Sequence, residues 1–160
     1  MTIWGARVVA VDDDFDTLDL VRAILEVHGA QLVPVSAPGA ALSTVVGVMP
    51  DVLLVDIAMP GEDGLALVRK LRTLSPEKGG RIPAATLTAL PAPAERLAEW
   101  RRIGFQRHLA KPFHPDTLVE VVDALAGRVV ERRTMALAPP CWPRDVRRDR
   151  RREWRDGLCC

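Results

Sequence analysis

The sequence predicts an α/β fold, in which a doubly wound, five-stranded parallel sheet carries helices on both faces. Two observations lead to this prediction. Short apolar runs alternate with longer segments of helical spacing, and strands joined by helices form a parallel sheet with right-handed crossovers. In addition, Val52–Val55 is almost wholly apolar, as expected of a strand that helices cover on both sides.

Each predicted strand is a short run rich in strand-forming residues, and the fourth run is the weakest. The predicted strands are Val8–Val11, Gln31–Val35, Val52–Val55, Ile82–Leu87 and Phe105–Ala110. Each strand is followed by a segment with helical spacing. The predicted helices are Phe15–His28, Pro38–Val48, Gly64–Leu74, Ala94–Ile103 and a last one that starts at Pro115. Glycines end three of them, at Gly29, Gly104 and Gly127.

The 160-residue chain divides by charge into two parts. Residues 1–130 carry 13 Lys+Arg and 16 Asp+Glu, a net charge of −3, whereas residues 131–160 carry 9 Arg and 5 acids, a net charge of +4. We expect residues 1–130 to form one domain and residues 131–160 to be an arginine-rich extension that is flexible or a short helix. Acids interleaved with the arginines weaken its field, and no DNA-binding domain is recognisable, so direct nucleic-acid binding is not expected.

The cysteines and the apolar runs indicate the cellular location to expect for the protein. All three cysteines, Cys141, Cys159 and Cys160, lie in the extension, and no disulfide framework spans the body. Asp12–Asp14 interrupt the early apolar run, so no signal peptide is predicted. No run reaches the roughly 18 apolar residues of a membrane span. We therefore expect a cytoplasmic protein with no membrane partner.

Residues that can ionise or bind an ion follow three of the predicted strands. Asp12 and Asp13 follow the first, Asp56 follows the third and Lys111 follows the fifth. The carboxyl ends of parallel strands meet at one edge, where ligands bind in such sheets. Carboxylates gathered there favour a hard divalent cation, Mg²⁺ before most others. A carboxylate beside a metal and a lysine is suited to attack a phosphoryl group, with Asp56 as the nucleophile and the Thr88 hydroxyl bonded to a phosphoryl oxygen.

Structural interpretations of these residues are also open. Asp12 and Asp13 could sit at the start of a helix, where carboxylates meet the positive end of the dipole, a role that we give to Asp14. His28 and His114 are interpreted as residues of helix ends. The assignment of Lys111 to the site rests on the neighbouring motifs, because a lysine before a proline is often merely exposed.

The combined pattern resembles the receiver domains of two-component response regulators. The resemblance covers about residues 5–128 and includes segments similar to receivers attached to hybrid histidine kinases. The matching segments are Val11–Asp14, Asp56–Gly64, Leu87–Ala89 and Lys111–Phe113. Four such segments in register with the strand ends make a specific signal, whereas each alone is weak. The resemblance implies a flavodoxin-like strand order, 2-1-3-4-5.

The resemblance also implies roles for individual residues. Asp56 is the phosphoacceptor, and Lys111 and Thr88 contact the phosphoryl group. The implied ligands of Mg²⁺ are Asp12, Asp13, Asp56 and the backbone carbonyl of Ala58. The implied donor is a histidine kinase or a phosphotransfer protein, and phosphorylation controls a face that binds a downstream protein target, with a homodimer as an open possibility. Such a chain is not an enzyme, beyond its own phosphorylation and dephosphorylation.

Two features depart from the family pattern. His108 stands where the family often has an aromatic ring that swings inward with the hydroxyl residue, so Thr88 and His108 are the switch candidates. Ala58 and Leu90 offer no polar group that could orient a water molecule against the acyl phosphate. We therefore predict a long-lived phosphorylated state.

Two other functions are weighed against the receiver. A phosphorylation-independent interaction module with the same fold is disfavoured by the retention of the whole set of ionisable residues. A Mg²⁺-dependent aspartyl phosphatase or phosphotransferase would want a general acid nearby, commonly an aspartate two residues after the nucleophile. Ala58 stands at that position.

Overall fold

The computed structural model describes residues 3–61 and 63–137, with the backbone alone for residues 128–137. All strand pairs are parallel, and they form a single five-stranded sheet in the order β2-β1-β3-β4-β5. The strands are β1 (Arg7–Val11), β2 (Gln31–Val35), β3 (Val52–Val55), β4 (Ala84–Thr88) and β5 (Arg107–Ala110). The predicted fold class and strand order are confirmed.

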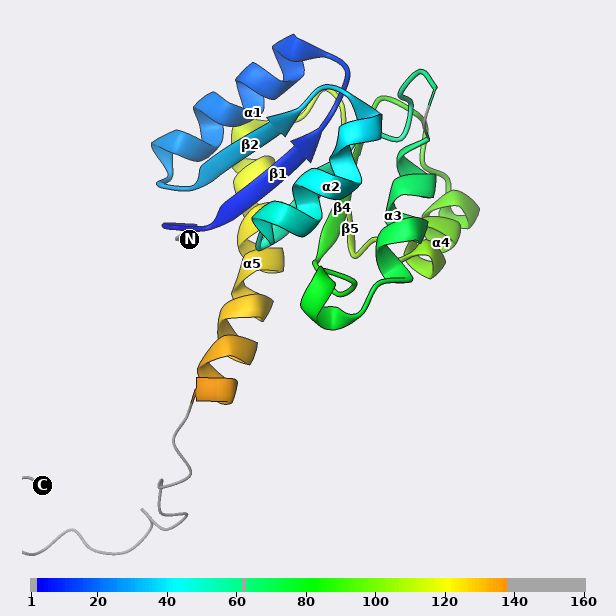
Figure 1. Ribbon diagram of the computed structural model, residues 1–160. Coiled ribbons are helices and arrows are strands. Elements are labelled where there is room, and N and C mark those ends of the chain that lie inside the picture. The colour runs from blue at the N-terminus through cyan, green and yellow to red at the C-terminus, as the bar shows by residue number, and fades with distance from the viewer. Residues whose placement is uncertain (1–2, 62, 138–160) are drawn as a thin grey trace, which may run out of the picture.

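Helices cover both faces of the sheet, as Figure 1 shows. They are α1 (Phe15–Val27), α2 (Pro38–Val48), α3 (Gly64–Arg72), α4 (Ala94–Ile103) and α5 (Pro115–Leu137), with a short 3-10 helix, η1, at Pro76–Lys78. α1 and α5 lie on one face, whereas α2, α3 and α4 lie on the other. The sheet is therefore the middle of three layers.

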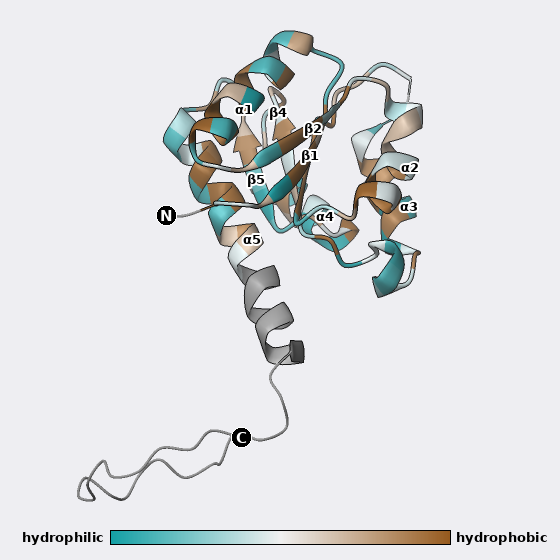
Figure 2. Ribbon diagram, turned by 60° about the vertical axis from the view of Figure 1, so that its left-hand side comes forward, coloured by the Kyte–Doolittle hydropathy of each residue, from teal (hydrophilic) through white to brown (hydrophobic). Residues whose placement is uncertain are grey.

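Alternate residues of each inner strand point to opposite faces and so build two separate cores. In β1, Val8 and Ala10 pack towards α1 and α5, whereas Val9 and Val11 pack towards α2, α3 and α4. Figure 2 shows hydrophobic residues gathered on the strands and polar residues on the outer surfaces of the helices. This arrangement explains why β3 is apolar throughout, since both of its faces are buried.

The prediction that the last helix ends at Gly127 is wrong. α5 continues to Leu137 and extends past the end of the sheet (Figure 1). Gly29 and Gly104 end their helices with φ of 79° and 122°, but Gly127 has no such positive φ. A glycine that keeps helical backbone angles costs a helix only about 1 kcal/mol. Residues 131–137 of the expected extension thus belong to α5, and residues 138–160 lie outside the described residues.

Other boundaries differ by one or two residues. β4 begins at Ala84, because Pro83 has no N–H to donate to a neighbouring strand. β5 begins at Arg107, and α3 ends at Arg72.

The topology has a switch point at the carboxyl end of the sheet. α1 leaves the end of β1 towards one face, whereas α3 leaves the end of the adjacent β3 towards the other face. The loops after these two strands therefore diverge, and such a point is where doubly wound sheets bind ligands. Asp12 and Asp56 are the first residues of these two loops.

Candidate functional site

The backbone of the sheet fixes the two buried carboxylates. The Asp12 N–H donates to the Val35 carbonyl at 3.1 Å, and the Asp56 N–H donates to the Val11 carbonyl at 2.9 Å. Each aspartate thus continues the hydrogen-bond ladder one residue beyond its strand. Asp12 is 0% exposed and Asp56 is 7% exposed. Their carboxylates are consequently held at the sheet edge with little freedom.

One ammonium group bridges the two carboxylates. Nζ of Lys111 donates to Oδ2 of Asp12 at 2.5 Å and to Oδ2 of Asp56 at 2.8 Å. The Lys111 N–H donates to the carbonyl of Thr88 at 2.9 Å, which fixes the base of this side chain beside the end of β4. Since only 16% of the Lys111 side chain is exposed, water screens these contacts weakly.

Burial and charge shift the pKa values of these groups. Burial raises the pKa of Asp12, and the hydrogen bond from Lys111 offsets only part of that cost. Burial alone would lower the pKa of Lys111, but hydrogen bonds to Asp12 and Asp56 outweigh it and raise the pKa above its ordinary value. The ammonium therefore stays charged, and the bond from Lys111 does not fully offset the cost of burying the Asp12 carboxylate.

A third carboxylate, that of Asp13, adds negative charge beside Asp12 and Asp56. One carboxylate oxygen from each of Asp12, Asp13 and Asp56 lies within 4.8 Å of the others, and Asp13 is exposed to solvent. Oxygen donors at this separation fit a hard divalent cation, which would stay partly hydrated on the Asp13 side. The structure thus brings together the three aspartates that the sequence places at a Mg²⁺ site.

The loop after β3 holds the candidate acceptor. Oδ1 of Asp56 accepts from the N–H of Ala58 at 2.8 Å, and Oδ2 accepts from Lys111. The Ala58 side chain is exposed, and Leu90 beyond β4 is 40% exposed. Only apolar side chains therefore stand at these two positions. The role of the Ala58 backbone carbonyl as a metal ligand stays a prediction.

Thr88 and Asp14 occupy the places expected of them. Thr88 ends β4 with no exposed surface, and its Oγ1 accepts from the Leu90 N–H at 3.2 Å. A hydroxyl can accept one bond and donate another, so Thr88 keeps a proton for an incoming oxygen. Asp14 caps α1, because its carboxylate accepts from the Asp16 N–H at 3.1 Å and from the Thr17 hydroxyl at 2.7 Å.

His108 lies in a second polar cluster, one that the sequence did not reveal. Its Nδ1 is 2.7 Å from Oγ1 of Thr86, and its ring centroid is 5.2 Å from that of Trp100. Thr86 is two residues before Thr88 and faces the same side of the sheet. In the sequence, a threonine between apolar residues of a buried strand indicates that a buried hydroxyl needs a hydrogen-bond partner. Only the strand register, which pairs Thr86 with His108, identifies its partner.

Gly64 allows the acceptor loop and α3 to meet closely. A Cβ at Gly64 would lie 2.2 Å from the Asp56 carbonyl oxygen and 2.7 Å from Cγ1 of Val55. Gly64→Ala must displace the backbone of Asp56, so we expect a loss of about 1–3 kcal/mol in the free energy of unfolding, measured in urea. Gly47→Ala, in an exposed part of α2 with open space around it, is the matched control and should be neutral or slightly stabilising. Equal stability of the two variants would contradict this close contact.

Comparison with known protein families matches residues 8–123 to the response regulator receiver domain. Among curated proteins, an uncharacterised 14.6 kDa protein of Leptolyngbya boryana is 39% identical over 121 residues, which are 76% of this chain and 90% of that protein. Protein PilH of Pseudomonas aeruginosa is 33% identical over 124 residues, which are 76% of this chain and 99% of that protein. The sensor protein GacS of Pseudomonas syringae is 34% identical over 72% of this chain and 13% of its own length.

Solved structures share the fold. The chemotaxis protein CheY4 of Vibrio cholerae aligns with a TM-score of 0.69 at 26% identity and covers 76% of this chain and 98% of its own. The receiver domain of the Francisella response regulator 1452 aligns with a TM-score of 0.71 at 27% identity, over 78% of this chain and 99% of its own.

Proposed function

The chain belongs to the family of response regulator receiver domains, and on that basis we propose that Asp56 accepts a phosphoryl group in a Mg²⁺-dependent reaction. The observation that carries the proposal is the single ammonium of Lys111, which bonds both Asp12 and Asp56 beside the exposed carboxylate of Asp13. A nucleophilic carboxylate, a fixed cation and a set of oxygen ligands are the parts that phosphoryl transfer requires.

The proposed reaction is a displacement at phosphorus. A carboxylate oxygen of Asp56 forms a bond to phosphorus as the bond from phosphorus to the donor breaks, and the donor leaves with that electron pair. The product is an acyl phosphate on Asp56. Mg²⁺, held by Asp12, Asp13, Asp56 and the Ala58 carbonyl, would neutralise phosphoryl oxygens. Lys111 supplies a second positive charge, and the Thr88 hydroxyl donates to a phosphoryl oxygen.

We propose that the donor is a histidine kinase or a phosphotransfer protein, and that the phosphorylated chain binds a downstream protein in the cytoplasm. Within residues 3–61 and 63–137, no helix is long and apolar enough to cross a membrane. The enzymatic alternative, an aspartyl phosphatase, lacks support at Ala58, where only a methyl group stands in place of a general acid.

Incubation with acetyl phosphate, followed by intact mass measurement, tests the proposal. With Mg²⁺ we expect a species that carries one phosphoryl group, and removal of Mg²⁺ with EDTA should suppress it. No adduct in the presence of Mg²⁺ would support the phosphorylation-independent interaction module instead. Continuous release of phosphate from esters over many turnovers would indicate the enzyme.

The phosphorylated state is expected to be long-lived. Neither Ala58 nor Leu90 can position a water molecule for in-line attack on the acyl phosphate. The half-life, followed by intact mass after removal of acetyl phosphate, should be many minutes, and a value of seconds would contradict the prediction. Ala58→Asn, which adds a polar group beside Asp56, should shorten it by about tenfold. The same change at Ala23, exposed in α1, is the control and should leave it unchanged.

A further inference from the structure

Thr86 and His108 form a hydrogen-bonded pair between β4 and β5. The strand register sets the two residues opposite each other, and Oγ1 of Thr86 is 2.7 Å from Nδ1 of His108. Thr86 is 0% exposed. Among the described residues, His108 is the only side-chain partner of this hydroxyl. The hydrogen bonding of the buried Thr86 hydroxyl therefore depends on His108.

The direction of this bond follows from the burial of Thr86. A hydroxyl carries one proton, which needs an acceptor when water cannot reach it. If Nδ1 carried the proton and donated to Oγ1, the hydroxyl proton of Thr86 would have no acceptor among the described groups. Burial therefore favours donation by the hydroxyl to an unprotonated Nδ1. A neutral imidazole whose Nδ1 accepts carries its proton on Nε2.

The other edge of the imidazole ring reaches solvent. Every buried side-chain nitrogen and oxygen in the described part of the chain has a hydrogen-bond partner. Nε2 of His108 has no hydrogen-bond partner among the described residues, so this atom is accessible. His108 lines a hollow of about 230 Å³ between α4 and β5, together with Leu97, Trp100 and Phe105. Nε2–H therefore faces a surface that is partly apolar.

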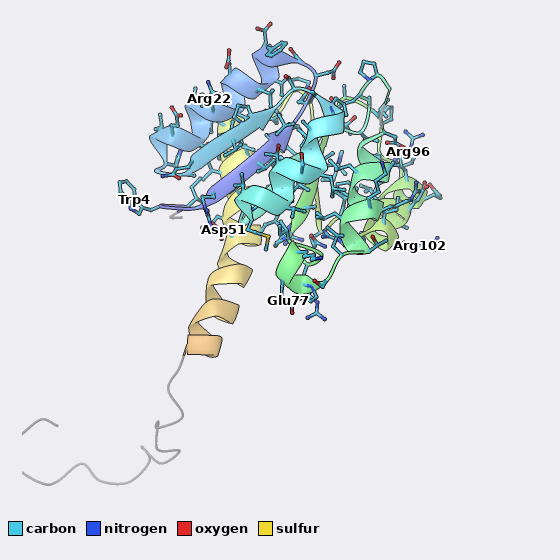
Figure 3. The ribbon with its side chains drawn as sticks, viewed as in Figure 1. Trp4, Arg22, Asp51, Glu77, Arg96 and Arg102 are labelled. Carbon is cyan, nitrogen blue, oxygen red and sulfur yellow. The ribbon has the colours of Figure 1, made fainter. Side chains whose placement is uncertain are left out.

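Exposed arginines lie on α4 and β5, beside this hollow. Arg101 and Arg107 line the same hollow, and both are exposed. Arg96 and Arg102 also project outward from α4 (Figure 3). On the α4 side, Glu99 is engaged with Arg69 at 3.9 Å. Burial lowers the pKa of His108, which favours the neutral imidazole.

We propose that Thr86 is a positioning residue that holds His108 in one ring orientation and as the Nε2–H tautomer, so that β5 presents a neutral hydrogen-bond donor at the hollow beside α4. This proposal goes beyond the proposed function by assigning the polar group on this face and the buried residue that sets it. A phenyl or phenol ring at this position has no ring nitrogen that could accept from the Thr86 hydroxyl.

The ¹⁵N and ¹H spectra of His108 in the unphosphorylated full chain test the proposal. The wild-type protein should show Nε2 protonated and Nδ1 as an acceptor. Thr86→Val keeps the shape of the side chain but removes the hydroxyl, and should raise the ratio of the Nδ1–H to the Nε2–H form by about fivefold. Thr86→Ser keeps the hydroxyl and should retain the wild-type spectrum, even though it removes a buried methyl group.

Two results would overturn the proposal: protonated Nδ1 in the wild-type protein, or the same His108 spectrum in Thr86→Val as in the wild type. If Thr86→Val does not fold, a change of tautomer in Thr86→Ser would overturn it, and the wild-type spectrum in Thr86→Ser would support it. All of these measurements use unphosphorylated protein. Their outcome is thus independent of whether Asp56 accepts a phosphoryl group.

Discussion

Asp56→Asn is expected to abolish the species that acetyl phosphate and Mg²⁺ produce. An amide is a poor nucleophile, and an acyl phosphate cannot form on it. The fold should persist, because burial and, to a smaller extent, the charge of Asp56 raise the pKa of Asp12, and the substitution removes that repulsion. The measurement is the intact mass after incubation, with circular dichroism to confirm the fold.

Asp19→Asn is the matched control for this variant. Asp19 is exposed on α1, and its Oδ1 lies 3.7 Å from Nη1 of Arg22. This control should be phosphorylated like the wild type. A full yield of adduct in Asp56→Asn would move the acceptor to another residue and contradict the assignment.

Lys111→Met is expected to slow phosphorylation by acetyl phosphate on the order of 10²-fold. The variant removes the ammonium that bonds both Asp12 and Asp56, and it leaves their carboxylates facing each other. The transferred phosphoryl group then loses a fixed positive charge where its own negative charge is concentrated. The rate at which the adduct appears in the intact mass spectrum measures this effect.

The control for Lys111→Met is Lys78→Met, in the exposed η1 helix before the start of β4. It removes the same charge from the chain and should leave the rate unchanged. Rates that agree within a factor of two between Lys111→Met and the control would show that Lys111 has no part in the transfer.

Lys111→Met also gives stability a distinct pH dependence. The pKa of Asp12 is already raised by burial, and loss of the Lys111 hydrogen bond should raise it further. A carboxyl whose pKa is higher in the folded state contributes stability below its unfolded value, and that contribution is lost as the pH rises through the folded value. The free energy of unfolding of Lys111→Met should therefore fall, relative to wild type, as the pH rises above the ordinary range of an aspartate.

The sequence was sufficient to predict the residues at the strand ends. Asp12, Asp56 and Lys111 each follow a short apolar run, and parallel strands joined by helices bring their carboxyl ends to one edge. Knowing which strands end in ionisable residues was enough, because the parallel topology brings those strand ends together in space. The observed bonds among these three side chains follow that expectation.

Two features depended on information that no local pattern contains. The bond between Thr86 and His108 needs the register of β4 against β5 and the packing of Trp100, which come from contacts far apart in the sequence. The end of α5 was misplaced because a glycine is compatible with both a helical and a left-handed backbone. The sequence around Gly127 does not distinguish these states, and the helix continues through it.

Chemical mapping of the phosphorylated residue tests the proposed role of Asp56 most directly. Borohydride reduces an aspartyl phosphate to homoserine, which changes the mass of the peptide that contains it. After treatment with acetyl phosphate and Mg²⁺, homoserine is expected at position 56 alone. Homoserine at position 12 or 13, or its absence from a protein that acquires a phosphoryl group, would contradict the assignment of Asp56 as the acceptor.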